Sequence, residues 1–178
     1  MKINCLISKF TFILLVILLG SCKTPVQEKQ EKVIDPYTKP LLEANKYMQE
    51  RNREQIQAFI ERTGWDMQET ETGLWYMILE AGDGAPINMD NMVVYSYETR
   101  LLSGKFCYSA DTTNPKKIVI GKGGVEAGIE EGLKFLKENG RAKLIIPPHL
   151  GHGNFGDRQE IPAAAILLVE VDVIRVRR

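Results

Sequence analysis

The stretch that decides the fold is AKLIIPPHLGHG at residues 142–153, which is followed by EIPAAA at residues 160–165 and an apolar run that ends at Val176. Residues 142–146 predict a short strand that stops at the pair Pro147-Pro148. Residues 165–176 alternate valines with charged residues, which predicts a strand with one buried and one solvated face. A loop rich in proline and glycine therefore joins two expected strands.

Three further strand patterns lie upstream, at residues 74–79, 92–102 and 117–120, and a turn signal at residues 82–86 follows the first of them. After the third, Ile129, Leu133 and Leu136 recur at helical spacing, which predicts a short helix over residues 125–137. Many strands and a single late helix predict an α+β domain at residues 65–178. In such a domain a curved antiparallel sheet wraps around that helix.

A longer helix is expected before this domain. Residues 41–62 contain no proline or glycine, their apolar residues recur mostly at helical spacing, and Gly64 closes the segment. The apolar stripe of this helix, at residues 41–64, can pack on its own domain. It can also pack on a second copy of the chain, so a homodimer stays open.

The first residues have the pattern of a bacterial lipoprotein signal. Lys2 and Lys9 precede an apolar run at residues 10–19, which is too short for a membrane-spanning helix of about 20 residues. Gly20 and Ser21 then lead to Cys22, which predicts a signal peptide at residues 1–21 and lipidation of Cys22. An uncleaved amino-terminal anchor is the alternative. Residues 22–40 are polar and predict a flexible tether.

This signal predicts a lipid-anchored protein of the bacterial cell envelope, and the resemblance to sorted bacterial lipoproteins implies that Lys23 after the cysteine favours the outer membrane facing the periplasm. The chain has 23 basic and 23 acidic side chains, and such a balance gives no electrostatic basis for binding nucleic acid. Of the three cysteines, only Cys107 lies in the expected domain. We therefore expect no disulfide there and interpret Cys107 as a small, half-buried apolar residue.

Other common kinds of site lack support. Residues 118–128 form a glycine-rich turn, but Glu126 stands where a dinucleotide fingerprint needs a small residue. His149, His152 and Asp157 lie close together in a loop, where nothing fixes them on one face, so we expect solvated histidines rather than a metal site. No cofactor and no metal are expected.

A series of short motifs runs in order through about residues 72–176. The motifs are Tyr97, Leu101-Leu102-Ser103-Gly104, Gly121, Val125-Glu126-Ala127-Gly128, Glu130-Glu131-Gly132, Gly140-Arg141-Ala142, Pro147-Pro148, Gly153 and Ile161-Pro162. Taken together, they resemble the FK506-binding-protein (FKBP) class of peptidyl-prolyl cis-trans isomerases. The lipoprotein signal and the segments at residues 95–97 and 108–109 resemble the FKBP-type lipoproteins associated with gliding motility.

The resemblance implies an isomerase that assists the folding of proline-containing polypeptides in the envelope. Such an enzyme needs no nucleophile, because an apolar pocket that favours the twisted amide is sufficient. The catalytic residues it implies are Tyr97, Val125, Glu126 through its backbone N–H, Ile129, His152 and Ile161. The further substrate-pocket residues it implies are Cys107, Tyr108 and Val169.

This chain departs from the family pattern at the pocket. Cys107-Tyr108 stands where active relatives carry Phe-Asp, Ile129 where they place an aromatic floor, His152 where they place a tyrosine, and Val169 where they place another aromatic residue. Because aromatic rings supply much of the contact area of such a pocket, we expect weak activity on small proline peptides. A non-catalytic interaction module in an envelope assembly is the alternative.

Overall fold

The computed structural model describes residues 38–178. The predicted signal peptide, Cys22 and most of the predicted tether lie outside the described residues. A compact unit extends from Pro40 to Arg178. Among residues 38–178, no helix has the length and apolar character needed to cross a membrane.

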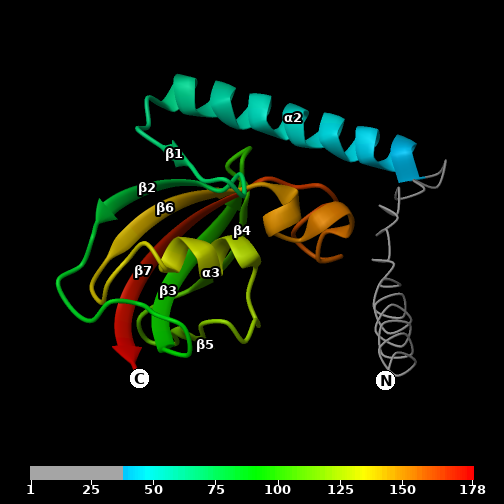
Figure 1. Ribbon diagram of the computed structural model, residues 1–178. Coiled ribbons are helices and arrows are strands. Elements are labelled where there is room, and N and C mark those ends of the chain that lie inside the picture. Colours follow the sequence, from blue (N-terminus) through cyan, green and yellow to red (C-terminus); the bar gives the residue numbers. More distant parts are fainter. Residues whose placement is uncertain (1–37) are drawn as a thin grey trace, which may run out of the picture. The chain divides into compact units, whose positions relative to one another are not determined.

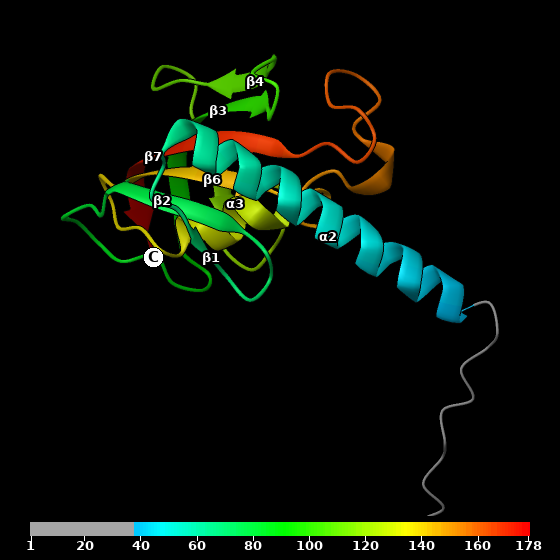
Figure 2. The ribbon, with the colours of Figure 1, turned by 90° about the horizontal axis from the view of Figure 1, so that it is seen from above.

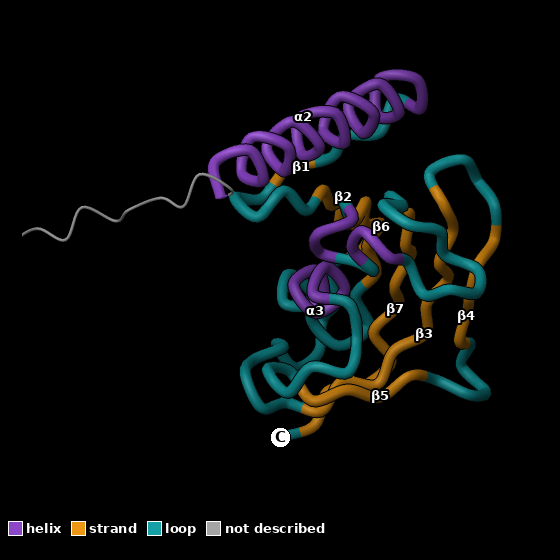
Figure 3. Tube along the Cα trace, turned by 90° about the vertical axis from the view of Figure 1, so that its right-hand side faces the viewer, coloured by secondary structure: helices purple, strands orange, loops and turns teal. Residues whose placement is uncertain are grey.

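One antiparallel sheet organises the described part of the chain, in the order β1-β2-β6-β7-β3-β4, while β5 pairs with β3. It curves around the short helix α3, and the long helix α2 passes across one end (Figures 1 and 3). The predicted α+β class is confirmed. The elements are α2 Thr38–Thr63, β1 Gln68–Glu69, β2 Trp75–Glu80, β3 Met92–Leu101, β4 Phe106–Ala110, β5 Lys116–Val119, α3 Ala127–Leu133, β6 Arg141–Ile146 and β7 Leu167–Arg177.

The centre of the sheet is the long pairing of β3 with β7, which runs from Met92 opposite Arg177 to Leu101 opposite Leu167. Alternate residues of β7 are buried, from Leu167 through Val173, and the residues between them are partly exposed. The predicted alternation of a buried and a solvated face is therefore confirmed. Because neighbouring side chains point to opposite faces of a strand, one face of the sheet forms the main core.

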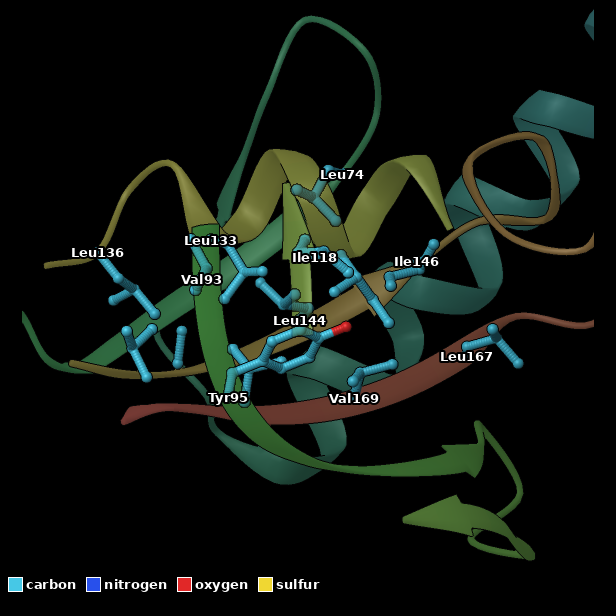
Figure 4. Close-up of a cluster of buried hydrophobic side chains, with 14 of the residues drawn as sticks. Leu74, Val93, Tyr95, Ile118, Leu133, Leu136, Leu144, Ile146, Leu167 and Val169 are labelled. Carbon is cyan, nitrogen blue, oxygen red and sulfur yellow. The ribbon is translucent and has the colours of Figure 1, made fainter. Parts of the chain in front are cut away.

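The main core lies between α3 and the concave face of the sheet (Figure 4). Ile129 and Leu133 of α3 are buried against β6. Two glycines permit this close approach. A Cβ atom on Gly132 would lie 2.5 Å from Leu144 Cδ1, and one on Gly128 would lie 2.6 Å from Ile146 Cγ2. The two glycines therefore set the distance between helix and sheet.

Helix α2 packs on the opposite face of the sheet through its carboxyl-terminal half. Ile56 is buried there in a second cluster with Ile145 and Ile166. The amino-terminal half projects beyond the sheet (Figure 2), and Leu41 and Leu42 are 65% and 57% exposed. The expected apolar stripe thus packs on its own domain over only part of its length.

Several predicted boundaries were wrong. The predicted helix at residues 125–137 is helical only over Ala127–Leu133, because Lys137 donates its N–H to Ala81 and pairs with Pro86. Helix α2 begins at Thr38, within the predicted tether, and ends at Thr63, immediately before Gly64, whose φ is 67°. Strand β4 and the two-residue β1 were not predicted, because both are short and lack a clear alternation.

Candidate functional site

The candidate site is a cavity of about 400 Å³ at the entrance to α3, which we call the α3 pocket. It is bounded by β3, by the turn that leads into α3 and by the loop that follows β6. This volume lies within the range of small-molecule sites. The lining residues are Tyr95, Tyr97, Lys116, Gly124, Val125, Glu126, Ile129, Gly151 and His152.

Five of the predicted site residues meet in this pocket. They are Tyr97, Val125, Glu126, Ile129 and His152. Two other hollows have volumes of about 450 and 720 Å³, and the only predicted site residue that lines either of them is Tyr97. We therefore choose the α3 pocket as the candidate site because of the residues that line it, and not because of its volume.

The pocket wall is apolar on the side of β3 and α3. Tyr95 and Tyr97 lie two residues apart on β3 and so face the same side, with ring centroids 5.9 Å apart. Ile129, which is only 2% exposed, contributes apolar surface from α3. A small apolar ring can displace water from these surfaces.

Glu126 supplies a polar group at the edge of the pocket. It is the N-cap residue of α3, and its carbonyl oxygen accepts hydrogen bonds from the N–H groups of Ile129 and Glu130, at 3.0 and 3.1 Å. Its own N–H takes part in no hydrogen bond within residues 38–178. This N–H is therefore available to a carbonyl group of a bound ligand.

The side chains of Glu126 and His152 join two walls of the pocket. His152 Nε2 lies 2.8 Å from Glu126 Oε1, and each side chain is about one quarter exposed, at 27% and 23%. Because a carboxylate only accepts hydrogen bonds, His152 Nε2 carries the proton. The contact therefore fixes the ring of His152 against the start of α3.

The two pocket tyrosines are held in their protonated form. Burial raises the pKa of Tyr95, and the negative charge of Glu126 raises it further. The pKa of Tyr97 is also raised, first by burial and then by Glu126. Both phenols therefore stay neutral at physiological pH and can donate hydrogen bonds.

The other four predicted residues do not line this pocket. Ile161, Val169 and Cys107 are buried in the main core, with exposures of 2%, 0% and 5%. Cys107 was expected to be half-buried but is only 5% exposed, and burial raises the pKa of its thiol. A direct contact of these residues with substrate stays a prediction.

Tyr108 and Ile161 instead organise the loop that follows β6. Tyr108 donates a hydrogen bond to Asp157, and this bond is the main reason that the pKa of Asp157 is lowered to about 2. The other carboxylate oxygen of Asp157 accepts the N–H of Ile161 at 2.9 Å. These residues hold the loop that carries His152.

The two histidines of the loop have separate partners. His149 Nε2 lies 2.8 Å from the carbonyl oxygen of Thr72, whereas His152 contacts Glu126. Within residues 38–178, no group of three or more His, Cys, Asp or Glu side chains has an arrangement that could hold a metal ion.

Sequence reasoning missed four pocket residues, which are Tyr95, Lys116, Gly124 and Gly151. Tyr95 carried a usable signal, because the alternation of β3 places it on the same face as Tyr97. Lys116 and the glycines carried none, since their positions depend on how two loops meet.

Comparison with known proteins identifies the family of this chain. Residues 84–174 match the model of the family described as FKBP-type peptidyl-prolyl cis-trans isomerase. The chain therefore belongs to the FKBP-type peptidyl-prolyl cis-trans isomerase family.

The relatives in this family include bacterial proteins. The chain is 37% identical over 109 residues to the isomerase FkpA of Escherichia coli strain K12, and 34% identical over 109 residues to FkpA of Buchnera aphidicola subsp. Schizaphis graminum. These alignments cover 61% of this chain but only 39% and 42% of the two relatives, so the chain spans less than half of their length.

The crystal structure of FkpA from Escherichia coli is similar to the present one, with a TM-score of 0.62 and 25% sequence identity. The similarity covers 95% of this chain and 82% of that chain.

Proposed function

We propose that this protein is a peptidyl-prolyl cis-trans isomerase (EC 5.2.1.8) that acts on proline-containing polypeptides by a non-covalent mechanism. The observation that carries the proposal is the α3 pocket, where an apolar wall lies beside the unused backbone N–H of Glu126. Family membership supports the same activity.

The reaction is rotation about an X-Pro peptide bond. Its barrier is about 18–20 kcal/mol, because the amide loses its resonance when it twists. Each ~1.4 kcal/mol by which a site prefers the twisted form over the planar form accelerates the rotation about tenfold. The site therefore needs a pocket that fits the proline ring, excludes water from the amide and positions hydrogen-bond donors. It needs no reactive side chain.

Each part of the pocket supplies one of these requirements. Tyr97, Val125 and Ile129 enclose the proline ring and exclude water from the amide. The Glu126 N–H donates to a carbonyl oxygen of the substrate and sets the register of the peptide. The contact of His152 with Glu126 keeps the opposite wall in place while the bond rotates.

We also propose that the protein works in the bacterial envelope as a lipoprotein anchored through Cys22, in the outer membrane facing the periplasm. The support is the signal pattern that ends at Gly20-Ser21-Cys22, together with the bacterial relatives. A Cys22→Ser variant is expected to move from the membrane fraction to the soluble fraction. A variant that stays in the membrane fraction would contradict lipidation at Cys22.

The activity is tested by refolding a protein whose slow phase is limited by proline isomerisation. The purified protein is expected to accelerate this phase in proportion to its concentration. Short proline peptides are expected to be poorer substrates, because Ile129 offers less contact area than an aromatic floor. No acceleration at high protein concentration would leave the alternative, a non-catalytic binding module in an envelope assembly.

A further inference from the structure

Tyr95 is the largest of the fully buried side chains in the described residues, with an exposure of 1%. It belongs to the main core, beside residues of β6 and β7 such as Leu144 and Val169 (Figure 4). It also lines the α3 pocket. The ring of Tyr95 is therefore part of the main core and also part of the wall of the α3 pocket.

The hydroxyl group of Tyr95 forms no hydrogen bond within residues 38–178. Buried hydroxyl groups nearly always have a partner, because an unpaired one loses its interaction with water without replacement. Only the ion-paired atoms Arg141 Nε and Asp172 Oδ1 are fully enclosed without a hydrogen bond in the described residues. The oxygen of Tyr95 is therefore not fully enclosed, and the hollow that it can reach is the α3 pocket.

Tyrosines elsewhere in the domain behave differently. The hydroxyl of Tyr76 donates to Gln68 Oε1 at 2.7 Å, and that of Tyr108 donates to Asp157. The two pocket tyrosines, Tyr95 and Tyr97, lack such a partner within residues 38–178; Tyr47 lacks one too, but its side chain is 59% exposed to water. This distribution indicates that a ligand, rather than the protein, completes their hydrogen bonds.

Burial and nearby groups keep the Tyr95 hydroxyl protonated. Burial raises the pKa of Tyr95 most, and Glu126 and Tyr97, which line the same pocket, raise it further. A neutral phenol can donate one hydrogen bond to a substrate atom.

We propose that the Tyr95 hydroxyl donates a hydrogen bond to the bound X-Pro segment and is a further catalytic residue of the isomerase. This inference rests on the proposed function. The acceptor that fits the reaction is the proline nitrogen. In the planar amide its lone pair is delocalised, and in the twisted amide the lone pair becomes localised and can accept a hydrogen bond. A donor at this place stabilises the twisted form selectively.

The test is the Tyr95→Phe variant, which keeps the ring and removes only the hydroxyl. We expect kcat/KM in the isomerase assay to fall about fivefold to tenfold, mainly through kcat, because the bond is made only in the twisted state. The midpoint of urea unfolding is expected to stay unchanged or to rise, since the hydroxyl has no partner within the domain.

The matched control is Tyr76→Phe, which removes a hydroxyl that is paired with Gln68, and neither of these residues lines the α3 pocket. It is expected to leave kcat/KM unchanged. Unchanged kcat/KM in Tyr95→Phe beside an active wild type would overturn the role of Tyr95 alone. A marked loss of stability in Tyr95→Phe would also overturn it, because the hydroxyl would then serve the fold. An inactive wild type would overturn the proposed function and this inference together.

Discussion

The two faces of the sheet differ in what they support. The face under α3 carries the main core, which includes Leu133, Leu144 and Val169 and borders the pocket. The smaller cluster on the opposite face, at the end where α2 passes, has three buried residues in the described part of the chain, Ile56, Ile145 and Ile166, with partly buried side chains around them. The pocket therefore borders the larger apolar cluster, whereas α2 packs on the smaller one. Mutations in each cluster can therefore measure the two contributions independently.

The rest of the opposite face is charged. Arg141 contacts Asp172 at 2.5 Å and Glu170 at 2.9 Å, and all three side chains are about 40% exposed. Exposed ion pairs contribute little to stability, since water screens them. The charged part of this face therefore contributes more to solubility than to the free energy of unfolding. Substitutions in the two apolar clusters are the better test of how the two faces differ.

The largest effect is expected in the main core. Leu133→Ala removes a side chain with 0% exposure and is expected to lower the free energy of unfolding by about 3 kcal/mol. Isomerase activity should fall with the folded fraction. Urea unfolding measures the change, and Leu42→Ala, at a residue that is 57% exposed, is a control expected within about 0.5 kcal/mol of the wild type.

A smaller effect is expected in the second cluster. Ile56→Ala should lower the free energy of unfolding by about 2 kcal/mol, at the low end for such a substitution because the cluster is small. Hydrogen exchange should become faster in the carboxyl-terminal half of α2. The isomerase rate per folded molecule should not change. A rate that fell with the loss of this contact would show that α2 supports the pocket.

At the pocket itself the effect is expected on rate rather than on stability. Tyr97→Ala removes a wall residue, and kcat/KM is expected to fall about tenfold, which corresponds to about 1.4 kcal/mol. Tyr97 is only partly buried, so the free energy of unfolding should change less than in Leu133→Ala. Unchanged kcat/KM would place the site elsewhere on the sheet.

The smallest effect is expected in the loop after β6 and depends on pH. The hydrogen bond from Tyr108 is the main cause of the lowered pKa of Asp157, about 2 against an ordinary 3.8. A lowered carboxyl pKa stabilises the folded state above the unfolded pKa, and this stabilisation is lost as the pH falls through the folded pKa.

Tyr108→Phe should therefore be slightly less stable than the wild type at pH 7. The difference should shrink as the pH is lowered from about 4 to about 2. Thermal unfolding across this range measures it, and Tyr47→Phe, at a side chain that is 59% exposed, should show no such dependence. A difference that persisted at the lowest pH would indicate that Tyr108 acts through packing.

Much of the fold could be predicted from local pattern. Alternation along β7 and the apolar run of β3 identified the two central strands, because a sheet with one buried face imposes a period of two. The end of α3 could not be predicted. Leu136 continues the apolar helical period, but the N–H groups of Lys137 and Glu138 donate to the carbonyl oxygens of Ala81 and Ala85, and this competing contact ends the helix.

The residues of the candidate site could also be predicted only in part. The family motifs marked Tyr97, Val125, Glu126, Ile129 and His152, which the fold brings together in one pocket. The resemblance also assigned Val169 and Cys107 to the pocket, at positions where the chain departs from the family pattern, and the fold buries both in the core.

By itself, the sequence determined the class of fold, the family and most of the residues around the pocket, because these depend on periodicity and on motifs that lie close together in the chain. Only the tertiary structure decided that His152 contacts Glu126 and that the Tyr95 hydroxyl has no partner within the described domain. The reason is physical: hydrogen bonding and burial at a side chain depend on atoms from distant segments, and folding alone brings those segments together.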